Sequence, residues 1–319
     1  MPFNRLQILL FIACLHSLSW NDSAINRVHA QEVTVVILGN AQDAGFPQAN
    51  CRKDCCKRAW QTPSDRRFAT CIAILDAKAG KRFLFECTPH FPDQLHLLNR
   101  ISTEQGLPTE TLDGIFLTHA HIGHYAGLVH LGREVMGTKS VPVHVMPRMR
   151  NFLISNGPWS QLVQLKNITL HKLLDRTEKQ MGNIRVTPIL VPHRDEFSET
   201  VGFRVQGPNR SLLFLPDIDK WEKWNLNINK EIAKVDIALV DGTFFGEGEL
   251  PGRNMKEIPH PFIQESLQRF EDLPGSEKEK IHFIHFNHTN PVLQNGSSAR
   301  KKILNAGFRI ARQAQMIRL

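Results

Sequence analysis

The chain of 319 residues contains a single tyrosine, Tyr125, and no stretch in which aromatic side chains alternate with basic ones. Its net charge is +8, but the basic residues are scattered along the sequence. A nucleic-acid groove needs grouped positive charge and aromatic surfaces for base stacking, so no nucleic-acid partner is expected. No linker or low-complexity tract divides the chain, which favours one domain.

Hydrophobic runs long enough to cross a membrane as a helix are absent after residue 30. Before that position, Arg5 precedes a short apolar stretch at residues 6–18. Val28-His29-Ala30 then places small residues three and one positions before a cleavage point ahead of Gln31. This order is typical of an export signal. We therefore expect residues 1–30 to be a signal peptide, residues 31–319 to form one domain, and the protein to be secreted or periplasmic. The alternatives are an uncleaved amino-terminal anchor, or a wrongly assigned start codon ahead of a cytoplasmic protein.

Cysteine is scarce, and its distribution is uneven. Six cysteines occur in all, and loss of Cys14 with the signal peptide leaves an odd number, so at least one thiol is unpaired or bound to metal. Cys51, Cys55 and Cys56 lie together, whereas the other two stand on separate apolar runs. Three clustered thiols suit a metal site completed by one ligand from elsewhere. One disulfide with a buried thiol would also account for them.

Apolar runs and helical spacing alternate along the whole chain. Two runs flank Ala79-Gly80 and predict a hairpin. Residues 219–233 and 260–271 predict helices, and residues 309–319 predict a closing strand. Clusters of strands separated by helices in two successive halves indicate a layered α+β sandwich, with the sheets inside and the helices outside.

The segment Leu117-Thr118-His119-Ala120-His121-Ile122-Gly123-His124 follows a short apolar run and contains three imidazoles within six residues. Burying three imidazoles is costly unless they bind something, and a divalent metal is the usual partner. Three later apolar strands also end in residues of ligand type, His193, Asp217 and His288. Because one edge of a sheet can gather all of these side chains, the sequence predicts a metal site.

The order His-x-His-x-x-His followed by an isolated His, Asp and His resembles the metallo-β-lactamase superfamily. That resemblance implies an αββα four-layer sandwich with one or two metal ions at the sheet edges. Further segments are similar to the branch of the pyrroloquinoline quinone biosynthesis protein B; they are residues 45–48, 191–196, 198–204, 215–221 and 287–291.

The resemblance implies two metal positions that share a carboxylate. The residues carried over are His119, His121 and His193 for the first position, Asp217 as the bridge, and His124 with His288 for the second. Most of the superfamily has an aspartate at the position of Gly123, which binds the second metal and helps to handle the catalytic water. Glycine can do neither, so we expect the second position to keep at most two imidazoles and the bridging carboxylate. The quinone-biosynthesis branch departs differently, since it keeps the acidic residue and lacks the full histidine set.

The same resemblance implies two further features. A cysteine cluster at this place in the branch is associated with structural zinc, which favours zinc over a disulfide at Cys51, Cys55 and Cys56. Independently of the resemblance, His260 is a candidate for the fourth ligand. Glu86 follows an apolar run at a position where the superfamily often has a structural carboxylate below the site. An exposed carboxylate at a strand end is the alternative for Glu86.

A metal with open coordination positions activates water, so hydrolysis of a small ester, amide, lactone or phosphodiester is the main hypothesis. Zinc, as one or two ions, suits the ligands, and iron or manganese would also fit. With glycine at position 123, another group must orient the water or protonate the leaving group. The candidates, besides Asp217 itself, are Asp219, Asp241, Glu196 and His260. The alternatives are an iron-dependent oxidase or hydroxylase and a non-catalytic metal-binding protein. The sequence does not indicate an oligomeric state.

Overall fold

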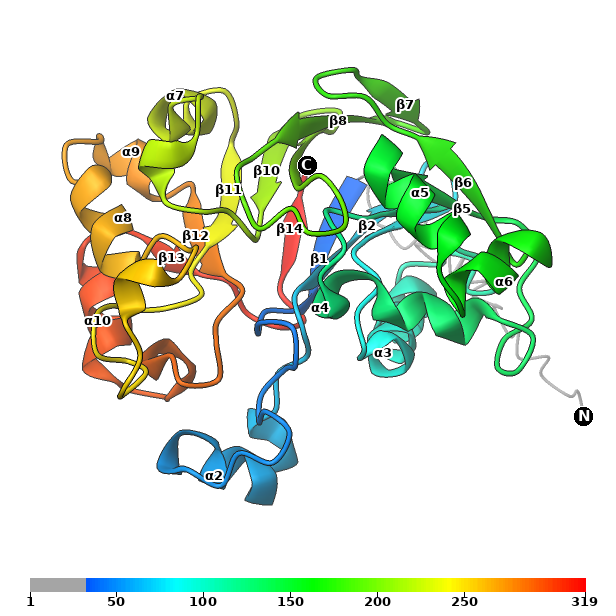
Figure 1. Ribbon diagram of the computed structural model, residues 1–319. Helices are drawn as coiled ribbons and strands as arrows, with labels where there is room; N and C mark the ends of the chain where they lie inside the picture. The colour runs from blue at the N-terminus through cyan, green and yellow to red at the C-terminus, as the bar shows by residue number, and fades with distance from the viewer. Residues whose placement is uncertain (1–32) are drawn as a thin grey trace, which may run out of the picture.

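The computed structural model describes residues 33–319, so the expected signal peptide lies outside the described residues. Its strands form two seven-stranded sheets, and helices cover the outer side of each sheet (Figure 1). The αββα sandwich that the resemblance implied is confirmed. Within the described part of the chain, none of the helices has the length and apolar character that a bilayer crossing requires.

The first sheet comes mostly from the amino-terminal half. Its β2–β3 pair is antiparallel across Ala79-Gly80, which confirms the predicted hairpin. The pairs β3–β4, β4–β5 and β5–β6 are parallel, so the carboxyl ends of these strands lie at the same edge. In spatial order the strands are β14 (Met316–Arg318), β1 (Val33–Gly39), β2 (Cys71–Asp76), β3 (Lys81–Phe85), β4 (Gly114–Phe116), β5 (Val141–Val145) and β6 (Ile168–Lys172). The helices that pack against it are α3 (Phe91–Glu104), α5 (Pro147–Ser155) and α6 (Trp159–Gln164).

The second sheet comes mostly from the carboxyl-terminal half. The pairs β10–β11 and β11–β12 are parallel, and these strands also end at one edge. In spatial order the strands are β13 (Arg309–Ile310), β12 (Ile281–Ile284), β11 (Ile237–Asp241), β10 (Ser211–Leu215), β9 (Val201–Gln206), β8 (Ile184–Leu190) and β7 (Lys179–Met181). The helices on this side are α7 (Ile228–Ile232), α8 (Ile263–Arg269), α9 (Gly275–Lys278) and α10 (Ser298–Asn305). A separate helix, α2 (Asp54–Gln61), projects from the sandwich at the bottom of Figure 1.

Phenylalanine rings fill the space between the two sheets. Phe85 and Phe116 of the first sheet stack with centroids 4.8 Å apart, and Phe203 of the second meets Phe85 edge-on at 5.3 Å. All three side chains are fully buried. Burial of such a side chain stabilises the fold by roughly 1.5–3 kcal/mol. This core fixes the two sheets relative to each other and so brings their carboxyl-terminal edges together.

Two predicted elements differ from the structure. Residues 219–233 form only a 3-10 helix (Trp221–Lys223) and α7, because Asn227 caps α7 with its side chain and the helix begins there. The predicted closing strand is divided into β13 and β14, which belong to different sheets. Between them Ala314 has a φ of +65°, outside the strand region, so the chain turns and passes from the second sheet to the first.

His144 of β5 is a buried imidazole that lacks polar partners. It is 2% exposed and stacks on Phe116 with centroids 4.4 Å apart. Neither ring nitrogen has a hydrogen-bond partner among the described residues. Burial, together with the charges of Lys179 and His171, lowers the pKa of His144 to about 3. The folded protein therefore keeps this ring neutral.

We expect His144→Phe to make the stability of the protein less sensitive to acid. In the unfolded chain the imidazole binds a proton near pH 6.5, whereas in the folded chain it does so only near pH 3, so stability falls as the pH drops between these values. The contribution lost between pH 7 and pH 5 is on the order of 1–2 kcal/mol. Urea unfolding of the wild type and of His144→Phe at pH 7 and pH 5 measures this contribution. Any effect of metal loss is common to the two proteins and cancels when they are compared. An equal pH dependence in the two proteins would contradict the assignment.

Candidate metal centre

The loop after β4 brings its three histidines together. His119 and His124 are each 1% exposed, and their ring centroids are 4.2 Å apart. The His121 ring lies 4.3 Å from that of His119. Thr118 Oγ1 lies 2.8 Å from His119 Nδ1, which leaves His119 Nε2 to face the centre. The short helix α4 (Ile122–Tyr125) begins inside the motif and turns His124 back toward the other two rings.

Four predicted ligands form the first group, His119, His121, His193 and Asp217. One nitrogen or oxygen from each lies within 4.8 Å of the others. His119 Nε2 is 3.3 Å from Asp217 Oδ2, and His193 Nε2 is 3.3 Å from Asp217 Oδ1. These residues follow β4, β8 and β10, whose ends meet at one edge of the sandwich. The structure therefore brings together the four residues that the sequence analysis placed at the first metal position and at its bridge.

Three residues form the second group, Asp43, His124 and His285. Asp43 Oδ1 lies 3.1 Å from His124 Nε2 and 3.8 Å from His285 Nε2. Asp217 Oδ2 lies 3.5 Å from His124 Nε2 and 3.9 Å from His285 Nε2, so Asp217 stands between the two groups as the resemblance implied. Sequence reasoning missed both Asp43 and His285.

The structure corrects the placement of His288 and His260. His288 was expected beside His124, but its Nδ1 lies 3.3 Å from Cys56 Sγ instead. His285 follows β12 directly and takes the expected place, whereas His288 lies three residues farther along the loop. His260 was expected beside the cysteines, but its Nδ1 lies 2.8 Å from Asp241 Oδ2 and 3.2 Å from Asp217 Oδ1.

The predicted catalytic carboxylates have different surroundings. Asp241 is fully buried and accepts hydrogen bonds from Thr243, so it holds His260 rather than facing a substrate. Asp219 does not join either group, since its carboxylate pairs with Lys223 at 2.8 Å. Glu196 is exposed and lies 3.1 Å from His121 Nε2, at the outer side of the centre.

Glu86 supports the histidine loop from below. It is fully buried, and its Oε1 accepts a hydrogen bond from Thr118 Oγ1 at 2.5 Å. The same oxygen lies 3.2 Å from His124 Nδ1. Carboxylates that face the outer nitrogen of a ligand histidine fix its ring orientation. The expectation of a structural carboxylate at this position agrees with the geometry, and the exposed alternative does not.

Several buried polar atoms at the centre have no hydrogen-bond partner among the described residues. They are His119 Nε2, His124 Nε2, His193 Nε2, His285 Nε2, Asp43 Oδ1 and Asp217 Oδ1. Leaving a buried polar atom without a partner costs about 1–3 kcal/mol. Imidazole nitrogens and carboxylate oxygens that converge in this way are the donor set of a divalent metal. The residues present therefore fit such an ion.

The electrostatics of the centre are divided between neutral and charged groups. Burial lowers the pKa of His193 to about 4. Burial would also lower the pKa of His260, but Asp241 and Asp217 raise it to about 9. Burial opposes ionisation of Asp217, yet His193, His260 and His285 hold its pKa well below its usual range. The centre thus keeps an ionised carboxylate among imidazoles.

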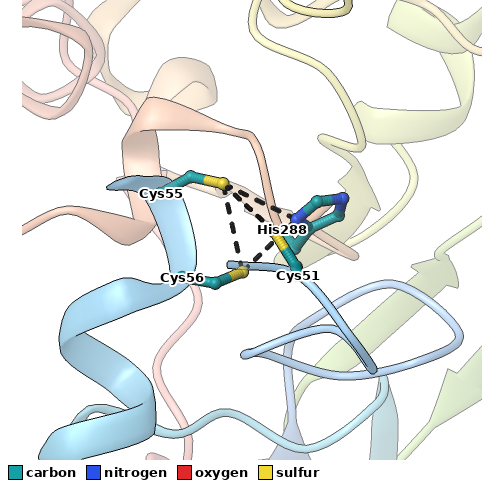
Figure 2. A group of neighbouring side chains, drawn as sticks. All are labelled: Cys51, Cys55, Cys56 and His288. Atoms are coloured by element: carbon teal, nitrogen blue, oxygen red, sulfur yellow. Dashed lines mark hydrogen bonds between the residues drawn. The ribbon is translucent and has the colours of Figure 1, made fainter. Parts of the chain in front are cut away.

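A second cluster lies apart from this centre, in the segment around α2. Figure 2 shows Cys51, Cys55, Cys56 and His288 pointing toward one another. The Sγ atoms of Cys51 and Cys55 are 3.7 Å apart, and those of Cys55 and Cys56 are 4.0 Å apart. Sulfur atoms around a tetrahedral zinc are separated by about 3.8 Å, given Zn–S bonds of about 2.3 Å. None of the five described cysteines forms a disulfide.

The thiols of this cluster (Cys51, Cys55, Cys56) resist joint ionisation without a cation. Burial and the neighbouring thiols raise the pKa of Cys56 to about 12, and burial with Cys51 raises that of Cys55. Only the pKa of Cys51 is lowered, because backbone and thiol hydrogen bonds outweigh its burial. A bound cation would remove this conflict, since metal ligation stabilises thiolates.

Comparison with known proteins agrees with the fold. Residues 81–286 match the family described as "Beta-lactamase superfamily domain". The chain belongs to the metallo-β-lactamase superfamily. It is 26% identical over 308 residues to Coenzyme PQQ synthesis protein B of Methylobacterium nodulans, a match that covers 89% of this chain and 99% of the relative. The predicted likeness to that branch is confirmed.

Solved structures show the same fold. Zn²⁺-bound PqqB from Methylobacterium extorquens superimposes with a TM-score of 0.73 at 21% identity, covering 90% of this chain and all of the other. A diphosphatase from the PhnP family superimposes with a TM-score of 0.64 at 19% identity, covering 90% of this chain and 97% of the other.

Proposed function

We propose that this protein is a metal-dependent hydrolase that acts on a small, negatively charged substrate. The observation that carries the proposal is the convergence of unpartnered imidazole and carboxylate atoms at one sheet edge, beside a cavity that reaches His260. When bound at the first group, the metal supplies a Lewis acid and lowers the pKa of its water to roughly 7. The histidines and Asp217 hold that ion in place.

The cavity beside the centre supports a substrate of negative charge. It has a volume of about 410 Å³, and its wall includes Arg194 and Arg253 as well as His260. Arg194 Nη2 lies 3.5 Å from His121 Nδ1, so the cavity adjoins the first group. Arg253 forms no ion pair with the described residues, and the wall carries one carboxylate, Glu257, against its two guanidinium groups. Guanidinium groups recognise carboxylate and phosphate, so an anionic ester such as a phosphodiester suits this wall.

His260 is placed to hold a proton for the leaving group. It lies on the cavity wall, and Asp241 Oδ2 fixes its Nδ1 at 2.8 Å. Its ring is therefore held through Nδ1 by a buried carboxylate, in a residue that lines the cavity. A positioned histidine that protonates a leaving group contributes about 10²–10⁴-fold to the rate.

We expect the metal-loaded protein to hydrolyse anionic esters and to lose this activity after chelation. A panel of phosphodiester, phosphomonoester, carboxylic ester and lactone substrates measures the preference, with metal content determined on the same samples. His260→Gln should lower kcat by about 10²–10⁴-fold and leave the metal content unchanged. Loss of metal from this variant would show that His260 is a ligand instead. Full metal occupancy without turnover on any substrate would favour a non-catalytic binding protein.

An oxidative reaction is the second candidate, because the likeness to Coenzyme PQQ synthesis protein B covers nearly the whole chain. Nitrogen and oxygen ligands of this kind also suit iron or manganese. The metal content separates the candidates. Zinc with hydrolysis supports the first proposal, whereas iron with oxygen uptake supports an oxidase or hydroxylase.

We also propose that Cys51, Cys55, Cys56 and His288 hold a structural zinc ion. Cys56→Ser should remove one equivalent of zinc per chain and lower the free energy of unfolding by at least ~2 kcal/mol, because binding energy at such a site is folding energy. Cys71→Ser, a buried thiol outside the cluster, is the matched control and should keep the zinc. If Cys56→Ser retained the full zinc content, the cluster would not be a metal site.

Export is part of the same proposal, and it is supported by the positive, apolar and small-residue segments within residues 1–30. The processed protein should begin at Gln31. Amino-terminal sequencing of protein recovered outside the cytoplasmic membrane checks this expectation. A product that still begins at Met1 would show that the segment is not cleaved.

A further inference from the structure

Gly123 faces the backbone and side chain of Asp43. A Cβ atom added to Gly123 would lie 2.3 Å from Asp43 Cα and 2.4 Å from Asp43 Oδ1. Contacts this short do not occur between real atoms, so no side chain can stand at position 123 while the Asp43 segment keeps its place. The glycine that interrupts the histidine motif therefore makes room for a carboxylate from another part of the chain.

Backbone hydrogen bonds hold the segment that carries Asp43. Gln42 N donates to Phe286 O at 2.8 Å, which fixes the segment beside His285. Phe46 N donates to Arg67 O at 2.8 Å on the other side of Asp43. Gly45 between them has a φ of +72°, a conformation that glycine adopts without strain. These hydrogen bonds position the backbone of Asp43.

The Asp43 carboxylate points at the second group. Its Oδ1 lies 3.1 Å from His124 Nε2 and 3.8 Å from His285 Nε2, yet it accepts no hydrogen bond from the described residues. The facing nitrogens of both histidines also lack hydrogen-bond partners. Asp217 Oδ2 completes the surroundings from the side of the first group. Two imidazoles and two carboxylates therefore surround one point, which corrects the expectation that this position lacks an acidic residue of its own.

We propose that Asp43 supplies the acidic ligand of a second metal ion, in the space that the side chain of residue 123 would otherwise occupy. The inference rests on the proposed metal centre and makes it a two-metal site bridged by Asp217. Two ions about 3.5–4 Å apart stabilise both the attacking and the leaving oxygen in hydrolysis.

Metal analysis of the full-length protein tests the proposal. The wild type should bind two ions at the centre in addition to zinc at the cysteine cluster. Asp43→Asn should lose one of these ions, or bind it at least ~100-fold more weakly, because the amide is neutral and coordinates metal weakly. Asp219→Asn, which removes a carboxylate that faces Lys223, is the matched control and should keep the wild-type content. Unchanged content and affinity in Asp43→Asn would overturn the proposal.

Manganese loading provides a readout that does not depend on activity. Two manganese ions at bridging distance give a spin-coupled electron paramagnetic resonance spectrum, and we expect the wild type to show it. Asp43→Asn should give the spectrum of isolated ions. A spin-coupled spectrum in that variant would count against Asp43 as a ligand.

Exchange of the two residues tests the spatial argument. Gly123→Asp alone should disturb the centre, because its side chain collides with the Asp43 segment. Asp43→Gly alone should lose the second ion. Asp43→Gly removes Oδ1 and Cβ, two of the three colliding atoms, and leaves a shift of the glycine backbone to relieve the remaining contact at Cα, so the double variant should recover the second ion. If the double variant bound no more metal than Asp43→Gly, the idea that positions 43 and 123 share one space for a carboxylate would be contradicted.

The possible failures are distinguishable. If the wild type held metal only at the cysteine cluster, the proposed function itself would be wrong. If it held one ion at the first group, and Asp43→Asn held the same ion with the same affinity, the metal centre would stand and only the role of Asp43 would be excluded.

Discussion

The buried carboxylate of Asp217 is the constraint around which the rest of the centre is arranged. It is 3% exposed, and each of its two oxygens faces a different pair of imidazoles. Oδ1 lies near His193 and His260, whereas Oδ2 lies near His119 and His124. A buried anion is unstable unless positive charge and hydrogen bonds surround it. The histidines that surround Asp217 come from both sheets, and they reach it because the ends of both sheets meet at one edge.

The parts of the centre that could be predicted are those set by local sequence. His119, His193 and Asp217 each follow an apolar strand closely, and parallel strands present such ends at a common edge. The positions of His260 and His288, each of which lies at the site where the other was expected, could not be predicted in this way. His285 and His288 are only three residues apart on one loop, and the path of that loop decides which of them reaches the centre. His260 precedes α8 rather than following a strand, so only tertiary packing brings it to Asp241.

Asp43 is a different case, because its signal was present but indirect. Nothing in residues 40–46 marks the carboxylate as a ligand, whereas Gly123 marks where a carboxylate is missing. The ligand lies in the segment around residue 43, whereas the missing side chain lies in the histidine loop, and only the contact of these two segments in the folded protein connects them.

The division of the last predicted strand also depends on tertiary structure. Residues 309–319 have a continuous strand pattern, but the turn at Ala314 assigns their two ends to different sheets.

The cysteine cluster and the metal centre involve the same two segments of the chain. Asp43 and Cys51 lie on the segment after β1, while His285 and His288 lie on the segment after β12. Backbone hydrogen bonds already join these segments on both sides of Phe286. A cation held by the cluster would join them again, and each additional connection restricts the positions that Asp43 and His285 can adopt relative to each other. A cluster that contributes nothing to the cavity wall can therefore control how accurately the second group is assembled.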